Sequence, residues 1–223
     1  MKIRLLLLAI LLGCKGLMAL SPVAVSVSGA KHFPPFCDET GKRFVLRNEQ
    51  AKFGRKFLRA QWQAIGLDAL SMSLLFVMPR EVSNWSVPQV GLVRAQYRRS
   101  FTRLPVFDSD VWYINYIGHP YQGACYYNAM RSQGAKFWQA GLFALGNSLV
   151  WEYVGEGGME QPSVQDLVVT PFVGSLLGEL IHHGTVQLSR NGFKWYEKVF
   201  VCLFNPMFAI NNGFKYAKKP CQL

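Results

Sequence analysis

Charged residues are scarce in this 223-residue sequence, and acidic ones are scarcer than basic ones. Charged residues make up 17% of the chain, with 13 Asp and Glu against 24 Lys and Arg, so the formal net charge is +11. With 20 Gly and 11 Pro, the chain is not collagen-like. An apolar content of 50% excludes a mainly disordered chain, and a mean hydropathy of +0.11 lies between soluble enzymes and polytopic membrane proteins. We therefore expect one globular domain that associates with a membrane.

The sequence also lacks the short motifs of several enzyme classes. It contains no Cys-x-x-Cys pair, so a zinc ribbon or a thioredoxin-type site is not indicated. Without a Gly-x-Ser-x-Gly elbow, serine-nucleophile chemistry has no support. Phosphate-binding loops, dinucleotide fingerprints and the His-Glu-x-x-His zinc motif are missing as well. These absences exclude the enzyme classes that short sequence motifs identify. A catalytic site would therefore have to be assembled from residues that are distant in the sequence.

The amino terminus has the pattern of a secretory signal. A basic start precedes the apolar run Leu5–Gly13, which is too short to cross a membrane, since a spanning helix needs about 20 residues. The following Leu-Leu-Gly-Cys resembles a bacterial lipobox, so we expect a signal peptide over residues 1–13 and lipidation of Cys14. Ordinary cleavage after Ser28-Gly29-Ala30 is the alternative.

The cysteine count agrees with lipidation. Five cysteines are present, and assigning Cys14 to a lipid leaves an even set of Cys37, Cys125, Cys202 and Cys221. An oxidising periplasm would permit disulfides among these four. Cys202 lies in an apolar run and could equally be a free buried thiol.

Helical periodicity dominates the rest of the chain. We expect a linker over residues 14–47, a helical domain over 48–212 and a basic tail over 213–223. Within the domain the pattern predicts helices near residues 48–78, 111–132, 135–154, 163–183 and 193–209, with a bend at Pro120 and a break at Asn205-Pro206. Residues 80–110 predict an irregular crossing segment, and no strand pattern persists. The predicted fold is all-α, a membrane-associated bundle of four or five helices with kinked, polar-cored central helices.

The apolar stretches favour contact with a membrane over crossing it. Each is near or below the length that a spanning helix needs, and most contain a charge or an amide. Basic residues interleaved with aromatics, from Lys31 to Arg103 and in the tail, suit a surface of anionic lipid or lipopolysaccharide. A merely solvated basic face and a bundle that spans the membrane are the alternatives. Nucleic acid is not an expected partner of a secreted chain, and no protein partner is indicated.

Polar residues recur at helical spacing on otherwise apolar segments. Asn115 and His119 are four residues apart, as are Glu152 and Glu156, and Asp166, Thr170, Gly174, Gly178 and His182 follow at steps of four. Because residues four apart are neighbours on a helix, we expect these faces to meet in a buried cluster. The Gly174 and Gly178 pair would let a second helix approach closely. The candidate residues are Asn115, His119, Arg131, Glu152, Glu156, Asp166, Thr170, Glu179 and His182.

One interpretation of this cluster is a metal or acid/base site. Imidazole and carboxylate groups bind catalytic divalent metals, and a remaining carboxylate can activate water. The sequence does not fix which residues are ligands, or which metal or other cofactor would bind. Structural roles are the alternative: Asp166 could complete a capping box with Ser163, and His182 could simply interact with a helix end.

The other candidates have structural explanations too. His119 precedes Pro120 and could bond a carbonyl that the kink frees. Glu156 could be solvated at a helix end. Glu152 lies between aromatic residues and could form a buried ion pair with Arg131.

Four motifs in order resemble those of a bacterial family of cell-envelope proteins of unknown function. They are N-Y-x-x-H-P-Y-x-G within Trp112–Ala124, Y-x-x-A-R-x-x-G near residues 126–134 with Met130 in place of Ala, W-E-Y-x-x-E at Trp151–Glu156, and P-S-x-x-D-L-x-x-T-P with the glycines that follow it, from Pro162 to Glu179. The likeness covers about residues 75–180. It implies a Gram-negative envelope protein, and it assigns no activity and no catalytic residue.

These observations favour a non-enzymatic binding or scaffolding module at a membrane surface. We expect it on the periplasmic side of the cell envelope, associated with the outer membrane. The alternative is a metal-dependent or acid/base hydrolase or transferase that acts on a lipid or another envelope substrate.

Overall fold

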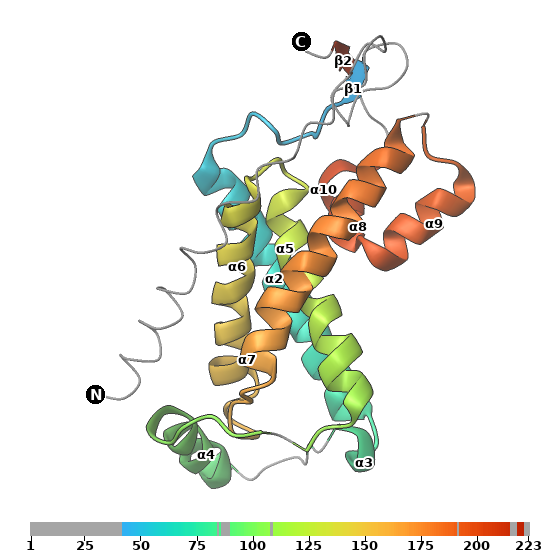
Figure 1. The fold of residues 1–223 in the computed structure, drawn as a ribbon. Helices are drawn as coiled ribbons and strands as arrows, with labels where there is room; N and C mark the ends of the chain where they lie inside the picture. Colours follow the sequence, from blue (N-terminus) through green and yellow to red (C-terminus); the bar gives the residue numbers. More distant parts are fainter. Residues whose placement is uncertain are drawn as a thin grey trace, which may run out of the picture. The chain divides into compact units, whose positions relative to one another are not determined.

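The structure is a computed structural model that describes residues 42–83, 85, 90–107, 109–190, 192–214 and 218–220. The expected signal peptide, most of the expected linker, and Cys14, Cys37 and Cys221 lie outside these residues. The described residues all belong to the contact unit formed by residues 33–223. They are mostly helical, which confirms the all-α class (Figure 1).

The α-helices follow the chain in the order α2 (Phe53–Val77), α3 (Arg80–Ser83), α4 (Val90–Thr102), α5 (His119–Arg131), α6 (Phe137–Val150), α7 (Asp166–Val168), α8 (Gly174–Ser189), α9 (Trp195–Phe204) and α10 (Pro206–Asn212). The expected break at Asn205-Pro206 separates α9 from α10. There the Asn205 side chain accepts a hydrogen bond from the Phe208 N–H, which caps α10.

The expectation of an irregular segment over residues 80–110 is wrong, because α3 and α4 lie there. Large apolar residues of α4, such as Leu92, are exposed rather than gathered on one buried face. Its sequence therefore does not show the apolar stripe from which a helix is predicted. Polar contacts hold it instead. The Tyr97 hydroxyl donates to the Val154 carbonyl at 2.6 Å, and the Ser100 hydroxyl donates to the Gly157 carbonyl at 2.8 Å.

A short antiparallel ladder joins the two ends of the described chain. Strand β1 (Lys42–Phe44) pairs with β2 (Lys218–Pro220), in the register Lys42 to Pro220. Both strands are three residues long, too short for an alternating pattern to persist in the sequence. Figure 1 shows the two strands side by side.

Three of the long helices in the described part contain a π-helical turn. These turns are η2 (Ile114–Gly118) before α5, η3 (Trp151–Gly155) after α6, and η4 (Val169–Val173) before α8. In η2 the His119 N–H bonds to the Ile114 carbonyl, and in η3 the Glu156 N–H bonds to the Trp151 carbonyl. The irregularity expected at Pro120 is therefore a π-turn that ends at Gly118, two residues before this proline. Turns of this kind occur frequently at functional sites.

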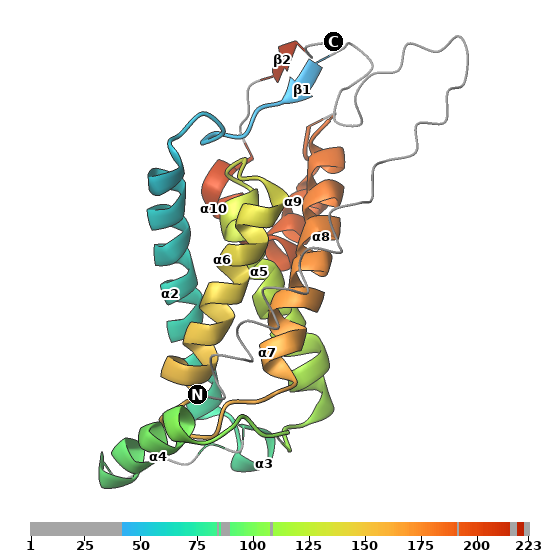
Figure 2. The ribbon, with the colours of Figure 1, turned by 60° about the vertical axis from the view of Figure 1, so that its left-hand side comes forward.

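Helix α5 lies between α2, α6 and α8 (Figures 1 and 2). It approaches η4 and α8 so closely that only glycine fits. A Cβ atom added to Gly123 would lie 1.8 Å from the Thr170 carbonyl oxygen, and one added to Gly174 would lie 2.7 Å from Gly123 Cα. A Cβ at Gly178 would lie 2.8 Å from a ring carbon of Tyr127. The close approach expected at Gly174 and Gly178 is thus present.

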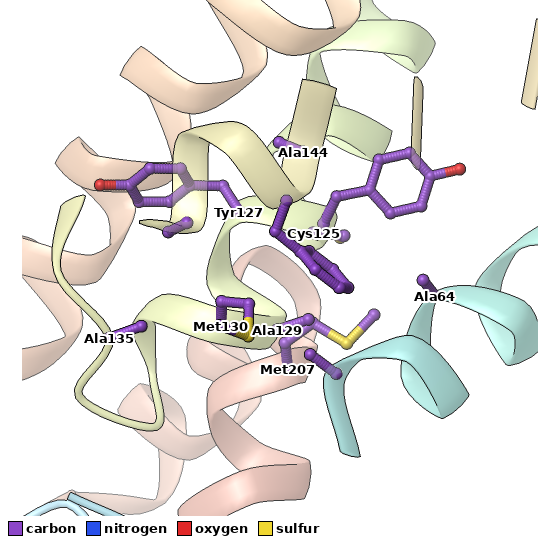
Figure 3. Packing of buried hydrophobic residues seen from close by; sticks show 12 residues of the cluster. Ala64, Cys125, Tyr127, Ala129, Met130, Ala135, Ala144 and Met207 are labelled. Carbon is purple, nitrogen blue, oxygen red and sulfur yellow. The ribbon is translucent and has the colours of Figure 1, made fainter. Parts of the chain in front are cut away.

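The buried apolar core consists largely of small residues and a few large ones. Figure 3 shows Ala64 of α2, Ala129 of α5 and Ala144 of α6 in the same cluster as Met130 and Met207. Cys125 is buried in this cluster and Cys202 is exposed, and both are free thiols. Many of the large apolar side chains lie on the exterior. None of the described helices combines the length and the apolar character needed to cross a membrane.

Candidate metal centre

His119, Glu152 and Asp166 come together from three separate segments of the bundle. His119 is the first residue of α5, Glu152 lies in η3, and Asp166 begins α7. One ligand atom from each residue lies within 4.8 Å of the other two. The three residues are only 5%, 1% and 2% exposed, respectively. We call these three residues the ligand triad.

Two neighbours orient the imidazole of His119. Its Nδ1 lies 3.2 Å from the Thr170 hydroxyl oxygen, in η4, and its Nε2 lies 3.8 Å from an oxygen of Asp166. With the proton on Nδ1, the ring donates to Thr170 and directs the Nε2 lone pair toward the Asp166 carboxylate. Metal-binding histidines commonly use one nitrogen for such an orienting hydrogen bond and the other for the metal.

Ser163 positions both carboxylates of the ligand triad. Its backbone N–H donates to Glu152 Oε2 at 2.9 Å, and its hydroxyl accepts from the Asp166 N–H at 3.2 Å. Only half of the expected capping box therefore forms. The serine caps the helix, but its own N–H binds Glu152 rather than Asp166. The Asp166 carboxylate can consequently face His119.

Glu156 extends the triad into a larger acidic cluster, which we define as His119, Glu152, Glu156 and Asp166. Burial is the main cause that raises the pKa of Glu156 well above its usual range, and the nearby Glu152 carboxylate raises it further. Glu156 is 7% exposed. The expectation that it is solvated at a helix end is therefore wrong, because this residue is buried at the end of η3. Asn115, in η2, is also buried.

A second set of polar residues joins α5 to α8, and we call Tyr127, Arg131, Glu179 and His183 the ion-pair cluster. Arg131 binds Glu179 through two hydrogen bonds, of 2.8 Å and 3.0 Å. The Tyr127 hydroxyl also donates to Glu179, and His183 Nε2 lies 3.0 Å from it. Burial would raise the pKa of Glu179, but the hydrogen bonds from Arg131 and Tyr127 outweigh it and lower that pKa to about 2.

The ion-pair cluster corrects two expectations. Arg131 does not pair with Glu152 as expected, because its guanidinium binds Glu179. His182 does not share a site with Asp166, because steps of four residues drift by about 40° each on an α-helix. His182 lies near Arg131 instead, and burial, followed by that positive charge, lowers its pKa to about 3.

Asp68 of α2 is a partly buried carboxylate that the sequence pattern did not single out. It accepts hydrogen bonds from the Tyr126 hydroxyl and from Gln122, both on α5. Burial raises the pKa of Asp68 to about 6, although these two hydrogen bonds partly oppose the rise. The available signal was a lone acidic residue in the otherwise apolar stretch that ends at Met78.

The ligand triad has donor atoms suited to a divalent metal. One imidazole nitrogen with carboxylate oxygens suits Zn²⁺, Mn²⁺ or Fe²⁺, and bundle cores build such sites from facing helices. Ligand atoms bound to one ion at about 2.1 Å lie about 3 to 4 Å apart. The 3.8 Å between His119 and Asp166 already falls in that range. The triad needs only a small contraction to surround an ion.

Comparisons with known proteins place the triad within a domain. Neither the curated proteins nor the solved structures contain a match to this chain. Residues 104–207 match a family model described as a domain of unknown function (DUF3943), and this span includes all of the acidic and ion-pair clusters. Over residues 104–207 the chain is thus similar to a domain of unknown function (DUF3943).

Proposed function

We propose that this protein is a binding module of the cell envelope that holds a divalent metal ion in its ligand triad and works at a membrane surface. The observation that carries the metal site is the convergence of His119, Glu152 and Asp166 in the core, with ligand atoms within 4.8 Å of one another. Export through residues 1–13, lipidation of Cys14 and a periplasmic position at the outer membrane belong to the same proposal.

Charge balance supports a cation in the triad. Glu152 and Asp166 place two buried carboxylates beside a single imidazole within the triad. Buried charges are stable when they are paired or when they bind a metal. The nearby charges that raise the pKa of Glu156 are all carboxylates, so the field in this region is negative. A divalent ion would neutralise it and draw the three ligands together.

The supporting residues fit a metal site as well. Thr170 would hold the His119 ring, and the Ser163 backbone would hold Glu152, each through the hydrogen bond described above. Partners of this kind, one step removed from the metal, typically contribute tenfold to a hundredfold in metal affinity. A bound metal would supply either cross-linking of three helical segments or activation of a water molecule.

The exterior of the bundle supports a position at a membrane surface. Large apolar side chains are exposed on most of the described helices, among them Trp62 of α2, Leu142 of α6, Leu176 of α8 and Phe200 of α9. Exposed apolar patches of large extent mark protein or membrane interaction sites. The net charge of +11 favours an anionic surface.

A hydrolase or transferase is the second candidate, favoured by the position of Glu156. This acid lies one turn beyond Glu152 at the end of a π-turn, and burial raises its pKa, which favours a carboxyl group that holds a proton. It could serve as a general acid or base beside the metal. This candidate predicts metal-dependent cleavage of phospholipid ester bonds that Glu156→Gln abolishes while the metal remains bound.

Metal analysis of the full chain, purified in mild detergent, tests the main proposal. We expect one divalent ion per chain in the wild type, detected by native mass spectrometry, and loss of this ion in His119→Ala, Glu152→Gln and Asp166→Asn. Glu160→Gln is the matched control, because this nearby carboxylate binds Trp85 and contributes no atom to the triad. Circular dichroism confirms that each variant folds. Retention of the ion in all three triad variants, or failure of the wild type to bind Zn²⁺, Mn²⁺ and Fe²⁺, would refute the site.

A further inference from the structure

A surface groove of about 550 Å³ lies between α2 and α10, away from the residues of both polar clusters. It is lined by Arg55, Leu58, Arg59, Trp62, Gln63 and Ile210. Its volume falls within the range of small-molecule sites. The lining combines two guanidinium groups with large apolar side chains, which is the composition that an anionic amphiphile requires.

Arg59 is held in place at the groove. Its Nε donates to Asn211 Oδ1 at 2.9 Å, and its Nη2 donates to the Ile210 carbonyl at 3.2 Å. Gln63 donates to the same Asn211 oxygen at 2.7 Å and so fixes the acceptor. A guanidinium has five N–H donors. Two of them orient Arg59, and the others are available to a ligand at little further cost in side-chain entropy.

Arg55 lies one helical turn before Arg59 and is exposed. Within the described part of the chain, neither guanidinium forms an ion pair with a carboxylate. Two arginines four residues apart present their charges on one side of a helix. Planar guanidinium groups bind phosphate oxygens through paired hydrogen bonds, so this pair is suited to a phosphate.

The apolar part of the groove is exposed to an unusual degree. Trp62 is 72% exposed, Leu58 63% and Ile210 56%. The stripe continues along α2, because Ile65 and Phe76 follow Leu58 and Trp62 at helical spacing and are exposed as well. An acyl chain that leaves the two arginines along α2 would cover this stripe. Tryptophan is typical of the boundary between headgroups and acyl chains.

We infer that this groove binds an anionic glycerophospholipid of the membrane, with the phosphate on Arg55 and Arg59 and the first part of an acyl chain on Leu58, Trp62 and Ile210. A free phosphate or a soluble sugar phosphate would leave the apolar side chains uncovered. The inference rests on the proposed position at a membrane surface and is independent of the metal ion.

Flotation of the full chain with lipid vesicles tests the groove. We expect tighter binding to phosphatidylcholine vesicles that contain phosphatidylglycerol than to phosphatidylcholine alone. Arg55→Gln/Arg59→Gln should weaken binding to the anionic vesicles by about thirtyfold, as expected for two basic residues at an anionic surface. The matched control is Arg94→Gln/Arg98→Gln, which removes the same charge at the same spacing from exposed positions of α4. It should weaken binding by less than about threefold, since these residues lie outside the groove.

The outcomes separate the groove from the wider proposal. Equal losses in the two double variants would overturn the groove, because general charge would then explain the binding. Wild-type protein that floats with neither kind of vesicle would contradict the membrane position itself. Arg55→Gln alone should still weaken binding about fivefold. It keeps the test valid if Arg59→Gln disturbs folding, because the side chain of Arg55 donates no hydrogen bond to the described residues. Metal content should be unchanged in every arginine variant.

Discussion

Two polar clusters lie along the same helix, and they solve the problem of buried charge in opposite ways. In the ion-pair cluster, Glu179 is bound by Arg131, Tyr127 and His183, so positive and negative groups balance. In the acidic cluster, three carboxylates share one imidazole. The hydrogen bonds lower the pKa of Glu179, whereas burial and neighbouring carboxylates raise that of Glu156.

This difference is the basis on which we propose a structural role for the ion-pair cluster and a functional role for the acidic cluster. A balanced cluster needs nothing further and serves to fix α5 against α8. A cluster with excess negative charge destabilises the fold unless a proton or a cation neutralises it. Stability is therefore the property by which the two clusters can be distinguished, and each of the following experiments compares them.

Addition of metal should have the largest effect. A metal that binds only the folded state at about a thousandfold excess over its Kd stabilises that state by about 4 kcal/mol. We expect this gain in urea unfolding of the wild type and its absence in Asp166→Asn. Glu179→Gln is the control, because it weakens the ion-pair cluster and should keep the metal-dependent gain. An equal gain in Asp166→Asn would show that the metal binds elsewhere.

Gly123→Ala should destabilise the fold by about 3 kcal/mol, the upper part of the usual range for overpacking. The new Cβ would meet the backbone carbonyl of Thr170 at 1.8 Å, and backbone cannot yield as a side chain can. Moving Thr170 also releases His119, so metal affinity should fall too. Thermal unfolding and metal titration measure the two effects.

Substitutions of two further glycines extend the comparison between the acidic cluster and the ion-pair cluster. In Gly178→Ala the new Cβ meets the ring of Tyr127, a member of the ion-pair cluster, and the substitution should cost about 1–2 kcal/mol without any change in metal affinity. Gly146→Ala, which meets nothing within 4 Å, should be neutral or slightly stabilising. A loss of metal affinity in Gly178→Ala would mean that the clusters are coupled.

Arg131→Met should lower the free energy of unfolding by about 2 kcal/mol, less than for a fully buried pair because both partners are partly exposed. The loss arises because Glu179 keeps its charge without its main partner. In Arg131→Met/Glu179→Met most of the stability should return, since both charges are gone. A double variant as unstable as the single one would show that packing of the arginine, rather than its charge, matters.

The pH dependence should show the smallest effect, with opposite signs in the two clusters. The raised pKa of Glu156 means that its contribution to stability is present below about pH 4.5 and is lost as the pH rises through the folded-state pKa. The lowered pKa of Glu179 means that its contribution is present above about pH 4.5 and is lost as the pH falls toward 2. Urea unfolding in the presence of EDTA, repeated between about pH 2 and pH 8, measures both contributions to stability.

Glu156→Gln isolates the first of these contributions. It should stabilise the metal-free protein near pH 8 and have little effect near pH 4, since the glutamine imitates the protonated acid. A uniform effect at both pH values would contradict the assignment.

Local sequence signals predicted a good part of the fold. Asn205-Pro206 marks a helix break because proline cannot continue the ladder, and Gly174 marks a close crossing because it lacks a Cβ. Helix α4 escaped prediction because hydrogen bonds from Tyr97 and Ser100, rather than an apolar stripe, hold it. The strands escaped because their pairing joins residues at opposite ends of the chain.

The site was harder to predict, for geometric reasons. Spacing identified His119, Glu152 and Asp166 as candidates, but it also grouped them with His182, which lies in the other region. Sequence spacing assumes 3.6 residues per turn along a whole helix and cannot show where this number is larger. Here it is larger at three π-turns. Arg131 forms its ion pair with Glu179 because α5 and α8 cross at these residues, and no local sequence pattern encodes that crossing.

The π-turn at Trp151–Gly155 has a consequence for how such a site can arise. A turn of this type accommodates one residue more than an α-turn, so a single-codon deletion would convert it to regular helix. Side chains on the two sides of the turn would keep their faces, because the π-turn absorbs the extra residue, whereas side chains within the turn would change direction. Glu152 would leave the cluster while most of the bundle stayed intact. The acidic cluster could thus be gained or lost in evolution through the insertion or deletion of one residue. The number of residues in the segment around η3, more than their identity, would then show whether a related protein has the cluster.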